Sequence, residues 1–492
     1  MNEKNIPIHP RREPKYTSAL TSDTLKDIFD RCSDFQYRKI KSGLLGDEIF
    51  VCWLDGIVNT SDIASDLLRP LTDIIRSGVS PDPEKLMAGA VYAATANKRD
   101  SLDDVVNDIT QGNAAVVFDD AQEAVCFELR SDKVRSVSEP TIEKSVKGAK
   151  DSFVEVLRTN TALVRRRICD PALKVINNTV GRKSATRCAV MFVDGVADPA
   201  TVSELTRRLD KIDIDGLLAT GSIEEYITDN PRSPLPQLLH SERPDRFARQ
   251  LLNGRVGLIV DGLPMGFLLP VTLAEFMRVP QDDSQHYTIA TVLGFVRWLA
   301  LILALTLPAF YVAVAMYHQE MIPTKLLLSV IQSKQDVPFS TALEVFGMLI
   351  AFELLQEASL RLPDAVGSTV SIIGALIVGQ SAVEAKVISP IAVIIVAVAG
   401  ISGFAQPSQD LSAAVRIGRL VLVLGAMAAG LYGVTALLCL MVWHLCTVNS
   451  FGVNYSAPLS QGRASRAFIR RPKPQDKLRE AELNTPDKRK QA

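Results

Sequence analysis

The stretch "TRCAVMFVDGVADPATVSELTRRLDKI" (residues 186–212) contains a strand, a turn and a helix in succession. An apolar run leads to Asp194-Gly195, and apolar residues then recur at helical spacing. An earlier stretch, "DEIFVCWLDGIVNTSDIASDLLRPLTDII" (residues 47–75), has the same order of features around Asp55-Gly56. The two aspartates are 139 residues apart. Both stretches therefore predict α/β structure, and they indicate an internal repeat.

A second pair of similar stretches follows the first. "SLDDVVNDITQGNAAVVFDDAQEAVCFEL" (residues 101–129) and "RPDRFARQLLNGRVGLIVDGLPMGFLLPV" (residues 243–271) each predict a helix and then a hairpin. Gly112 and Gly254, 142 residues apart, suit the helix ends, and Asp261-Gly262 is a hairpin signal. Duplication, independently reached architecture and chance similarity all remain open as explanations.

These patterns divide the chain into predicted regions. We predict a polar N-terminal tail, two small similar α/β subdomains joined by a linker, an α-helical multi-pass membrane domain, and a basic C-terminal tail. Their respective bounds are residues 1–33, 34–136, 137–150 (the linker), 151–285, 286–446 and 447–492.

Composition excludes several classes of protein. The 492-residue chain has a net charge of −1, whereas a dedicated nucleic-acid binder usually has a clear basic excess. Its seven cysteines form no C-x-x-C pair, which indicates a reducing compartment. The five histidines are scattered without metal-ligand spacing, so we expect no metal site and no cofactor. The N-terminus has no apolar core, so we expect no secretory signal.

Long apolar runs dominate the second half of the chain. Residues 287–317 contain one charge, Arg297, and are long enough to span a bilayer. Residues 366–383, 388–404 and 420–446 are the other candidate spans. The segment 338–360 carries three glutamates, which are costly in lipid, so we expect a non-spanning or re-entrant helix there.

The basic residues set the expected orientation. The C-terminal tail holds ten lysines and arginines, which predicts a cytoplasmic location by the positive-inside rule. The N-terminal region has no export signal and should also be cytoplasmic. Both ends inside require an even number of crossings, and we predict four. Five crossings with an external tail remain the alternative, because Arg416 and Arg419 would then be inside.

Catalytic motifs are not found in the sequence. "GRKS" (residues 181–184) resembles the end of a phosphate-binding loop, but it lacks the required earlier glycine and is better interpreted as a turn. There is no G-x-S-x-G, H-E-x-x-H or G-x-G-x-x-G. Asp55 and Asp194 lie at strand-to-helix turns, where aspartate is expected for structural reasons. We therefore expect no enzyme activity.

Several longer stretches resemble one known family. "LRTNTALVRRRI", "VGRKSATRCAVMFVDGVADP", "IDIDGLLATGSIEEYITDNPRSPLPQ", "SERPDRFARQLLNGRVGLIVDG", "YHQEMIPTKLLLSV" and "GALIVGQSAVEAKVISP" are similar to the GerA family of spore germination proteins. The resemblance covers residues 35–458 and is specific to the A subunit of nutrient germinant receptors. The closely similar stage V sporulation protein AF is the alternative within the family.

The resemblance implies a function and partners. Family members have a cytoplasmic N-terminal region and a multi-pass region in the spore inner membrane. They act with a transporter-like B subunit, which senses the nutrient, and a lipoprotein C subunit. The A subunit is expected to assemble as a homo-oligomer, a pentamer, into a ligand-gated cation channel that triggers germination. It contacts membrane lipid and no nucleic acid.

The run "RTNTALVRRR" (residues 158–167) places four arginines between the two predicted subdomains. Planar guanidinium groups bridge carboxylates well, so we predict that Arg165, Arg166 and Arg167 contact another subunit. A solvated basic helix start and binding to anionic lipid are the alternatives.

Two carboxylate-bearing segments are candidates for the ion path. Glu353 and Glu357 share a helix face at a spacing of four, and Gln380 and Glu384 repeat that spacing. In a symmetric ring each of the three glutamates would form a ring of negative charge, which favours cations. Pairing with Arg297, Lys386 or backbone groups is the alternative.

Two other functional classes fit the sequence less well than a gated channel. A secondary transporter usually needs more spans and inverted repeats. A membrane-anchored enzyme would need a soluble active site, and the sequence indicates none.

Overall fold

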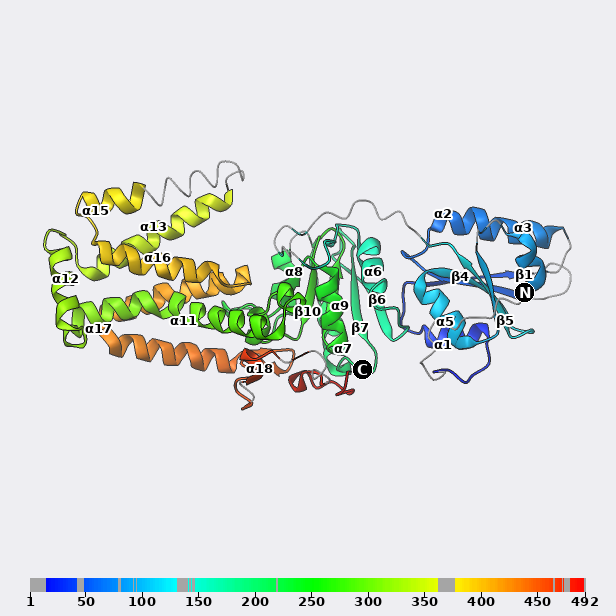
Figure 1. The fold of residues 1–492 in the computed structure, drawn as a ribbon. Coiled ribbons are helices and arrows are strands. Elements are labelled where there is room, and N and C mark those ends of the chain that lie inside the picture. The colour runs from blue at the N-terminus through cyan, green and yellow to red at the C-terminus, as the bar shows by residue number, and fades with distance from the viewer. Residues whose placement is uncertain are drawn as a thin grey trace. The chain divides into compact units, whose positions relative to one another are not determined.

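The computed structural model describes residues 15–41, 48–77, 81–91, 93, 95–130, 140, 143, 147–217, 220–361, 377–462, 465–470, 472 and 478–490. The chain divides into two compact units, coloured along the sequence in Figure 1. The first, the α/β unit, comprises Met1–Thr228, Leu238–Pro270 and Asp476–Ala492. The second, the helical unit, comprises Asp229–Gln237 and Val271–Gln475.

Subdomain 1 of the α/β unit is built on a five-stranded antiparallel sheet of order β1-β2-β4-β5-β3. Its strands are β1 (Phe35–Lys41), β2 (Glu48–Leu54), β3 (Ala96–Arg99), β4 (Asn113–Phe118) and β5 (Glu123–Glu128). Its helices are α1 (Ser22–Ile28), α2 (Thr60–Asp62), η1 (Ile63–Leu68), α3 (Arg69–Arg76), α4 (Pro83–Lys85), η2 (Leu86–Ala90) and α5 (Leu102–Gln111).

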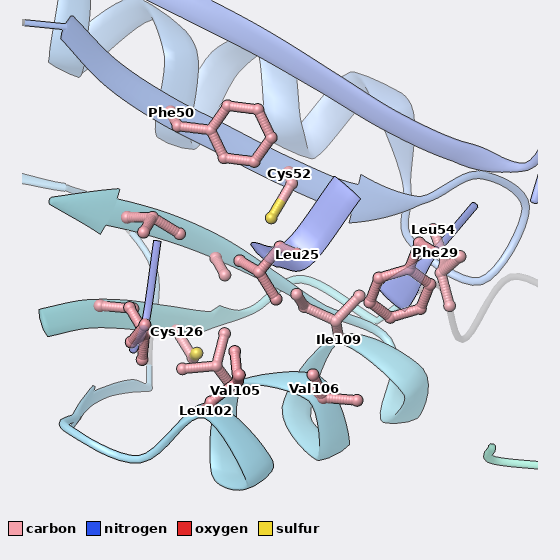
Figure 2. Close-up of a cluster of buried hydrophobic side chains, with 14 of the residues drawn as sticks. Leu25, Phe29, Phe50, Cys52, Leu54, Leu102, Val105, Val106, Ile109 and Cys126 are labelled. Atoms are coloured by element: carbon pink, nitrogen blue, oxygen red, sulfur yellow. The ribbon is translucent and has the colours of Figure 1, made fainter. Parts of the chain in front are cut away.

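Both faces of this sheet are covered, because successive side chains of its central strands enter different clusters. Along β2, Phe50 and Cys52 join one apolar cluster while Ile49 and Val51 join another. The first cluster packs against α1 and α5, and Figure 2 shows Phe50 and Cys52 facing Leu25 and Ile109. This two-sided burial explains why the central strands are continuous apolar runs.

Subdomain 2 repeats the same strand order with the next five strands, β6-β7-β9-β10-β8. Its strands are β6 (Leu173–Val180), β7 (Thr186–Val193), β8 (Leu239–Ser241), β9 (Val256–Val260) and β10 (Gly266–Leu269). Its helices are α6 (Leu157–Arg165), α7 (Pro199–Asp210), α8 (Thr220–Ile227) and α9 (Pro244–Leu252).

Local geometry agrees between the two subdomains as well. Gly112 and Gly254 follow α5 and α9 with φ of 100° and 105°, a left-handed conformation that favours glycine. The Asp55 amide donates to the Asp34 carbonyl at 2.7 Å, and the Asp194 amide donates to the Ala172 carbonyl at the same distance. The prediction of an α/β region is confirmed, and the region contains two five-stranded sheets with the same strand order.

The helical unit contains every long apolar helix of the described residues. Its main helices are α11 (Tyr287–Tyr317), α12 (Thr324–Lys334), α13 (Thr341–Arg361), α16 (Pro390–Phe404) and α17 (Gln409–Thr447). Shorter elements are α10 (Leu273–Phe276), η3 (Pro280–Ser284), η4 (Gln319–Met321), η5 (Ile377–Ser381), α15 (Ala382–Glu384), the hairpin β11 (Asn449–Ser450) and β12 (Val453–Asn454), and α18 (Ser465–Phe468). A separate core joins α11, α13, α16 and α17.

Helix α17 is a hairpin of two helical arms, because its backbone leaves the helical region at Ala429 and Gly430. A Cβ placed on Gly433 would lie 2.1 Å from the Gly425 carbonyl oxygen. In a straight helix these residues would be about 12 Å apart along the axis, so the chain must reverse between them. Gly430 has φ 57° and ψ −138°, a conformation essentially restricted to glycine.

The helices of the structure match the predicted membrane spans only in part. By length and composition, two helices of the described residues, α11 and α17, are apolar enough to cross a membrane, and α16 is shorter. The prediction of one continuous span over residues 420–446 is wrong, because the reversal at Gly430 interrupts it. Most of the predicted span 366–383 lies outside the described residues.

Candidate functional site

Helix α6, which carries the arginine run, lies at the junction of the two subdomains. Arg158 pairs with Asp55 of subdomain 1 at 2.5 Å, and Ala162 joins the apolar core of that subdomain. Gly56 has φ 87°, and a Cβ there would lie 2.9 Å from the Arg158 carbonyl oxygen. Helix α6 thus packs against the Asp55-Gly56 turn at a distance that only glycine allows.

Arg165 is the most buried member of the run, with a side chain that is 1% exposed. Its Nε and Nη2 donate to the two carboxylate oxygens of Asp34 at 2.7 and 2.9 Å. Burial alone would lower the pKa of the guanidinium, but the Asp34 carboxylate outweighs burial and the pKa is raised. The guanidinium therefore stays protonated, and its charge-assisted hydrogen bonds join residues 131 positions apart.

The remaining arginines lie near the end of α6. Arg167 donates to both oxygens of Asp151 at 2.6 and 2.7 Å, and its side chain is 24% exposed. Arg166 is the C-cap residue of α6, and it also has interaction partners. Because Arg165 is enclosed by its own chain, the predicted contact with another subunit rests on Arg166 and Arg167 and stays a prediction.

A backbone connection reinforces the junction. Cys32 and Val175 form a parallel bridge in which the Ser33 amide donates to the Val175 carbonyl at 2.8 Å. The Val175 amide in turn donates to the Arg31 carbonyl at 3.2 Å. Lys174 Nζ donates to the Ile28 carbonyl at 2.9 Å. Subdomain 1 is therefore joined to the edge of the second sheet by main-chain as well as ionic contacts.

In the helical unit, Glu353 of α13 pairs with two arginines of α17. Its carboxylate lies 3.1 Å from Arg416 and 2.5 Å from Arg419, whose side chain is 2% exposed. A carboxylate in this position neutralises charges that would be costly among apolar helices. The alternative partners considered from the sequence are engaged elsewhere: Arg297 pairs with Asp282 and Lys386 with Asp336.

The other three candidates for the ion path are exposed. Glu357 lies one turn beyond Glu353 on α13, and it has interaction partners of its own. Gln380 is in η5 and Glu384 ends α15, two residues before Lys386. The structure therefore places Glu353 in an ion-paired cluster and leaves exposed carboxylates at Glu357 and Glu384.

Glu344, one of the three glutamates of segment 338–360, is the most buried glutamate described in α13. Its side chain is 0% exposed, accepts from the Ser389 amide at 2.9 Å, and lies 3.1 Å from Lys334. Ser389 caps α16, and Pro390 occupies its first turn. This Ser-Pro helix-start signal could have indicated a site for a carboxylate.

The candidate carboxylates lie at different levels of the helical unit. Glu344 and Lys386 mark one end, where Lys334, Asp336 and Ser389 gather. Glu353 is nine residues further along α13, or about 13 Å along the helix axis. Glu384 lies two residues from Lys386 and is therefore at the same end of the helical unit as Glu344. Glu353 and Glu384 thus do not lie in one layer.

The "GRKS" segment is a turn, as interpreted from the sequence. Gly181 has φ 92°, and residues 182–184 form the turn between β6 and β7. Arg182 and Lys183 form exposed ion pairs with Asp213 and Asp215.

Comparisons with known proteins agree over nearly the whole chain. Residues 23–482 match the family described as Bacillus/Clostridium GerA spore germination protein. Spore germination protein KA of Bacillus subtilis (strain 168) is 35% identical, over 96% of this chain and 87% of that relative. The uncharacterized membrane protein YfkQ of the same organism is 36% identical, over 93% of this chain and 89% of YfkQ.

One solved structure is also similar. It is the crystal structure of the N-terminal domain of the A subunit of the Bacillus megaterium spore germinant receptor GerK3, 26% identical with a TM-score of 0.41. The match covers 52% of this chain and 98% of that chain. On the match of residues 23–482 and the identities to these relatives, the chain belongs to the GerA family of spore germination proteins.

Proposed function

We propose that this protein is the A subunit of a nutrient germinant receptor, which assembles in the spore inner membrane into a nutrient-gated cation channel. The observation that carries the proposal is the 35% identity to a spore germination protein over 96% of the chain. A germination-related role is common to the family. The channel activity, the oligomer and the inner-membrane location are the proposed parts.

The helical unit supports a membrane role. Arg297 is paired with Asp282 and also donates to the Met277 carbonyl at 3.0 Å. From Trp298 to Tyr317, α11 then continues for twenty apolar or uncharged residues, which is about 30 Å and matches the hydrocarbon thickness of a bilayer. The charges at its start are thus neutralised where the proposed span begins.

The ion path is proposed to use the exposed carboxylates. Glu353 is only partly exposed and pairs with Arg416 and Arg419, whereas the Glu357 and Glu384 side chains are exposed, where a cation in water can reach them. Repeated around a symmetric oligomer, each would contribute a ring of negative charge. Glu353 then holds α13 to α17, and Gln380 remains a neutral candidate beside Glu384.

The proposed partners are a nutrient-sensing B subunit and a lipoprotein C subunit, with further copies of this chain forming a pentameric ring. The α/β unit is proposed to lie on the cytoplasmic side, where the two subdomains would transmit the signal to the helices. No enzymatic step is part of this proposal.

The decisive experiment is single-channel recording of the purified full-length protein in planar bilayers, with and without the B subunit. We expect unitary currents that reverse near the potassium equilibrium potential in a potassium chloride gradient. Nutrient should raise the open probability only when the B subunit is present. Bilayers that stay silent with both subunits and nutrient would contradict the channel, and anion-selective currents would contradict the proposed ion path.

A further inference from the structure

Arg255, the residue before β9, is fully buried and holds two distant parts of the chain. Its side chain is 0% exposed, and its Nε donates to the Pro270 carbonyl at 3.1 Å. Its Nη2 pairs with Glu480 at 2.7 Å, and its Nη1 donates to the Gln250 side chain. A buried guanidinium is costly unless such partners are present, so these contacts specify one arrangement.

The two distant partners of Arg255 lie where the chain leaves and re-enters the α/β unit. Pro270 is the last residue of that unit before Val271 begins the helical unit. The chain returns to the α/β unit at Asp476, four residues before Glu480. One buried side chain thus binds both ends of the segment that contains the long apolar helices of the described residues.

The returning segment, residues 478–490, is an ordered element that we name the C-terminal strap. Leu478 and Arg489 form an antiparallel bridge, and the Arg479 amide donates to the Lys488 carbonyl at 3.1 Å. Arg479 also pairs with Asp487 at 2.6 Å and donates to the Leu252 carbonyl at 3.0 Å. These contacts close the strap on itself and attach it to the end of α9.

The strap packs closely on subdomain 2. Leu483 is 1% exposed and Thr485 is 4% exposed. A Cβ on Gly254 would lie 2.2 Å from the Thr485 methyl group, so the strap occupies space that exists only because position 254 is glycine. Apolar burial, a buried ion pair and a glycine-dependent approach all favour a permanent attachment over a transient contact.

We infer that the C-terminal strap is an integral part of subdomain 2, and that Arg255 clamps the exit of the chain toward α11 to its return from α17. Subdomain 2 then holds both ends of the segment between Pro270 and Glu480, so its movement acts on both ends together. The strap must lie on the same side of the membrane as the α/β unit, which requires an even number of crossings. The inference goes beyond the proposed function and does not depend on channel activity.

The attachment is tested by limited trypsin digestion of the full-length protein in detergent, because the strap contains several lysines and arginines. Leu483→Asp should speed cleavage within residues 478–490 at least tenfold, since it places a charge in a buried contact. Leu478→Asp is the matched control, because Leu478 lies in the same strap with 48% exposure, and its cleavage rate should remain that of the wild type. A wild-type strap that is cut as fast as that of Leu483→Asp would overturn the inference.

The contact of Arg255 with the strap is tested by Glu480→Ala, which changes one residue of the strap and no other residue of subdomain 2. We expect faster cleavage of the strap than in the wild type, and a Glu480→Gln variant that keeps one hydrogen bond should fall between the two. Equal cleavage rates in all three proteins would show that Arg255 does not hold the strap.

The sidedness is tested with impermeant maleimide in sealed vesicles, using proteins that keep one exposed cysteine and have the other exposed cysteines replaced by serine. One protein keeps Cys169, which is exposed in the α/β unit, and the other carries Asn484→Cys at the exposed tip of the strap. Both should be labelled from the same side only. Labelling of the two proteins from opposite sides would overturn the inference even if nutrient-gated currents were observed. Labelling of both from the same side would support it even if no current were found.

Discussion

At the residue scale, the charged side chains named from the sequence proved informative, but their partners were not predictable. The sequence predicts that the arginine run contacts carboxylates of another subunit, whereas Arg165 pairs with Asp34 of its own chain, 131 residues away, which the sequence does not indicate. Such a pair depends on how two subdomains pack, and no local spacing encodes that packing. Likewise, Glu353 was treated with Glu357 as a pair on one helix face, but its contacts are with Arg416 and Arg419.

The buried Arg165–Asp34 pair should contribute strongly to stability. Replacing Arg165 with glutamine leaves the Asp34 carboxylate buried without its counter-ion, which typically costs about 3–5 kcal/mol. We expect a clearly lower midpoint in the thermal unfolding of the full-length protein in detergent. Arg182→Gln is the control, because its pair with Asp213 is exposed and such pairs contribute less than about 1 kcal/mol. Equal midpoints for the two variants would contradict the role given to Arg165.

Glu353 and Glu384 should respond differently to replacement by glutamine. Glu353→Gln leaves Arg416 and Arg419 without a counter-charge, so we expect reduced protein levels in the membrane, measured by quantitative immunoblot. Glu384→Gln should leave the level normal but lower cation conductance or selectivity, because its side chain is exposed. Normal conductance and selectivity in Glu384→Gln would exclude this carboxylate from the ion path.

At the scale of elements, the strands and helices of the α/β unit followed from apolar runs, Asp-Gly turns and helix-ending glycines. The reversal within α17 did not, because "AMAAGLYGV" is an uninterrupted apolar run in which glycine is common for membrane helices. What distinguishes Gly430 is its backbone conformation beside Tyr317, and this depends on the packing of α11. Periodicity identifies an apolar helix but gives no information on where it turns back.

Gly430→Val should disrupt the α17 hairpin. A side chain at φ 57° and ψ −138° is strained by roughly 1–3 kcal/mol, and its Cβ would also lie 2.9 Å from the Tyr317 ring. We expect less folded protein in detergent extracts, measured by size-exclusion chromatography. Gly403→Ala is the matched control, because no atom lies within 4 Å of a Cβ there and its φ is not positive. A wild-type elution profile for Gly430→Val would argue for a straight helix.

At the scale of the whole molecule, the sequence predicted an α/β region of two similar subdomains followed by apolar helices. It did not reveal that the strand orders are identical, since non-local pairing sets that order. Nor did it show the C-terminal strap returning to subdomain 2, because the tail is polar and was interpreted from its charge alone. The strap depends on Gly254 and Arg255, which belong to a stretch more than two hundred residues earlier.

If Arg166 and Arg167 contact another copy of the chain, replacing both with glutamine while keeping Arg165 should reduce the mass of the solubilised particle. The loss of two positive charges would weaken contacts to carboxylates across the interface. Light scattering coupled to chromatography measures this, with Arg182→Gln/Lys183→Gln as the control for lost surface charge. An unchanged particle mass, with unchanged thermal stability, would contradict a contact of Arg166 and Arg167 with another copy of the chain.

The bridge between Cys32 and Val175 also affects how the protein avoids self-association. Strand β6 is an edge of its sheet, and an open edge offers unpaired amides and carbonyls to strands of other molecules. Here the Ser33 amide donates to the Val175 carbonyl, and the Val175 amide donates to the Arg31 carbonyl. The Ser33 hydroxyl accepts from the Asn177 amide. Residues 31–33 therefore also cover part of an edge through which concentrated copies of the chain would otherwise aggregate.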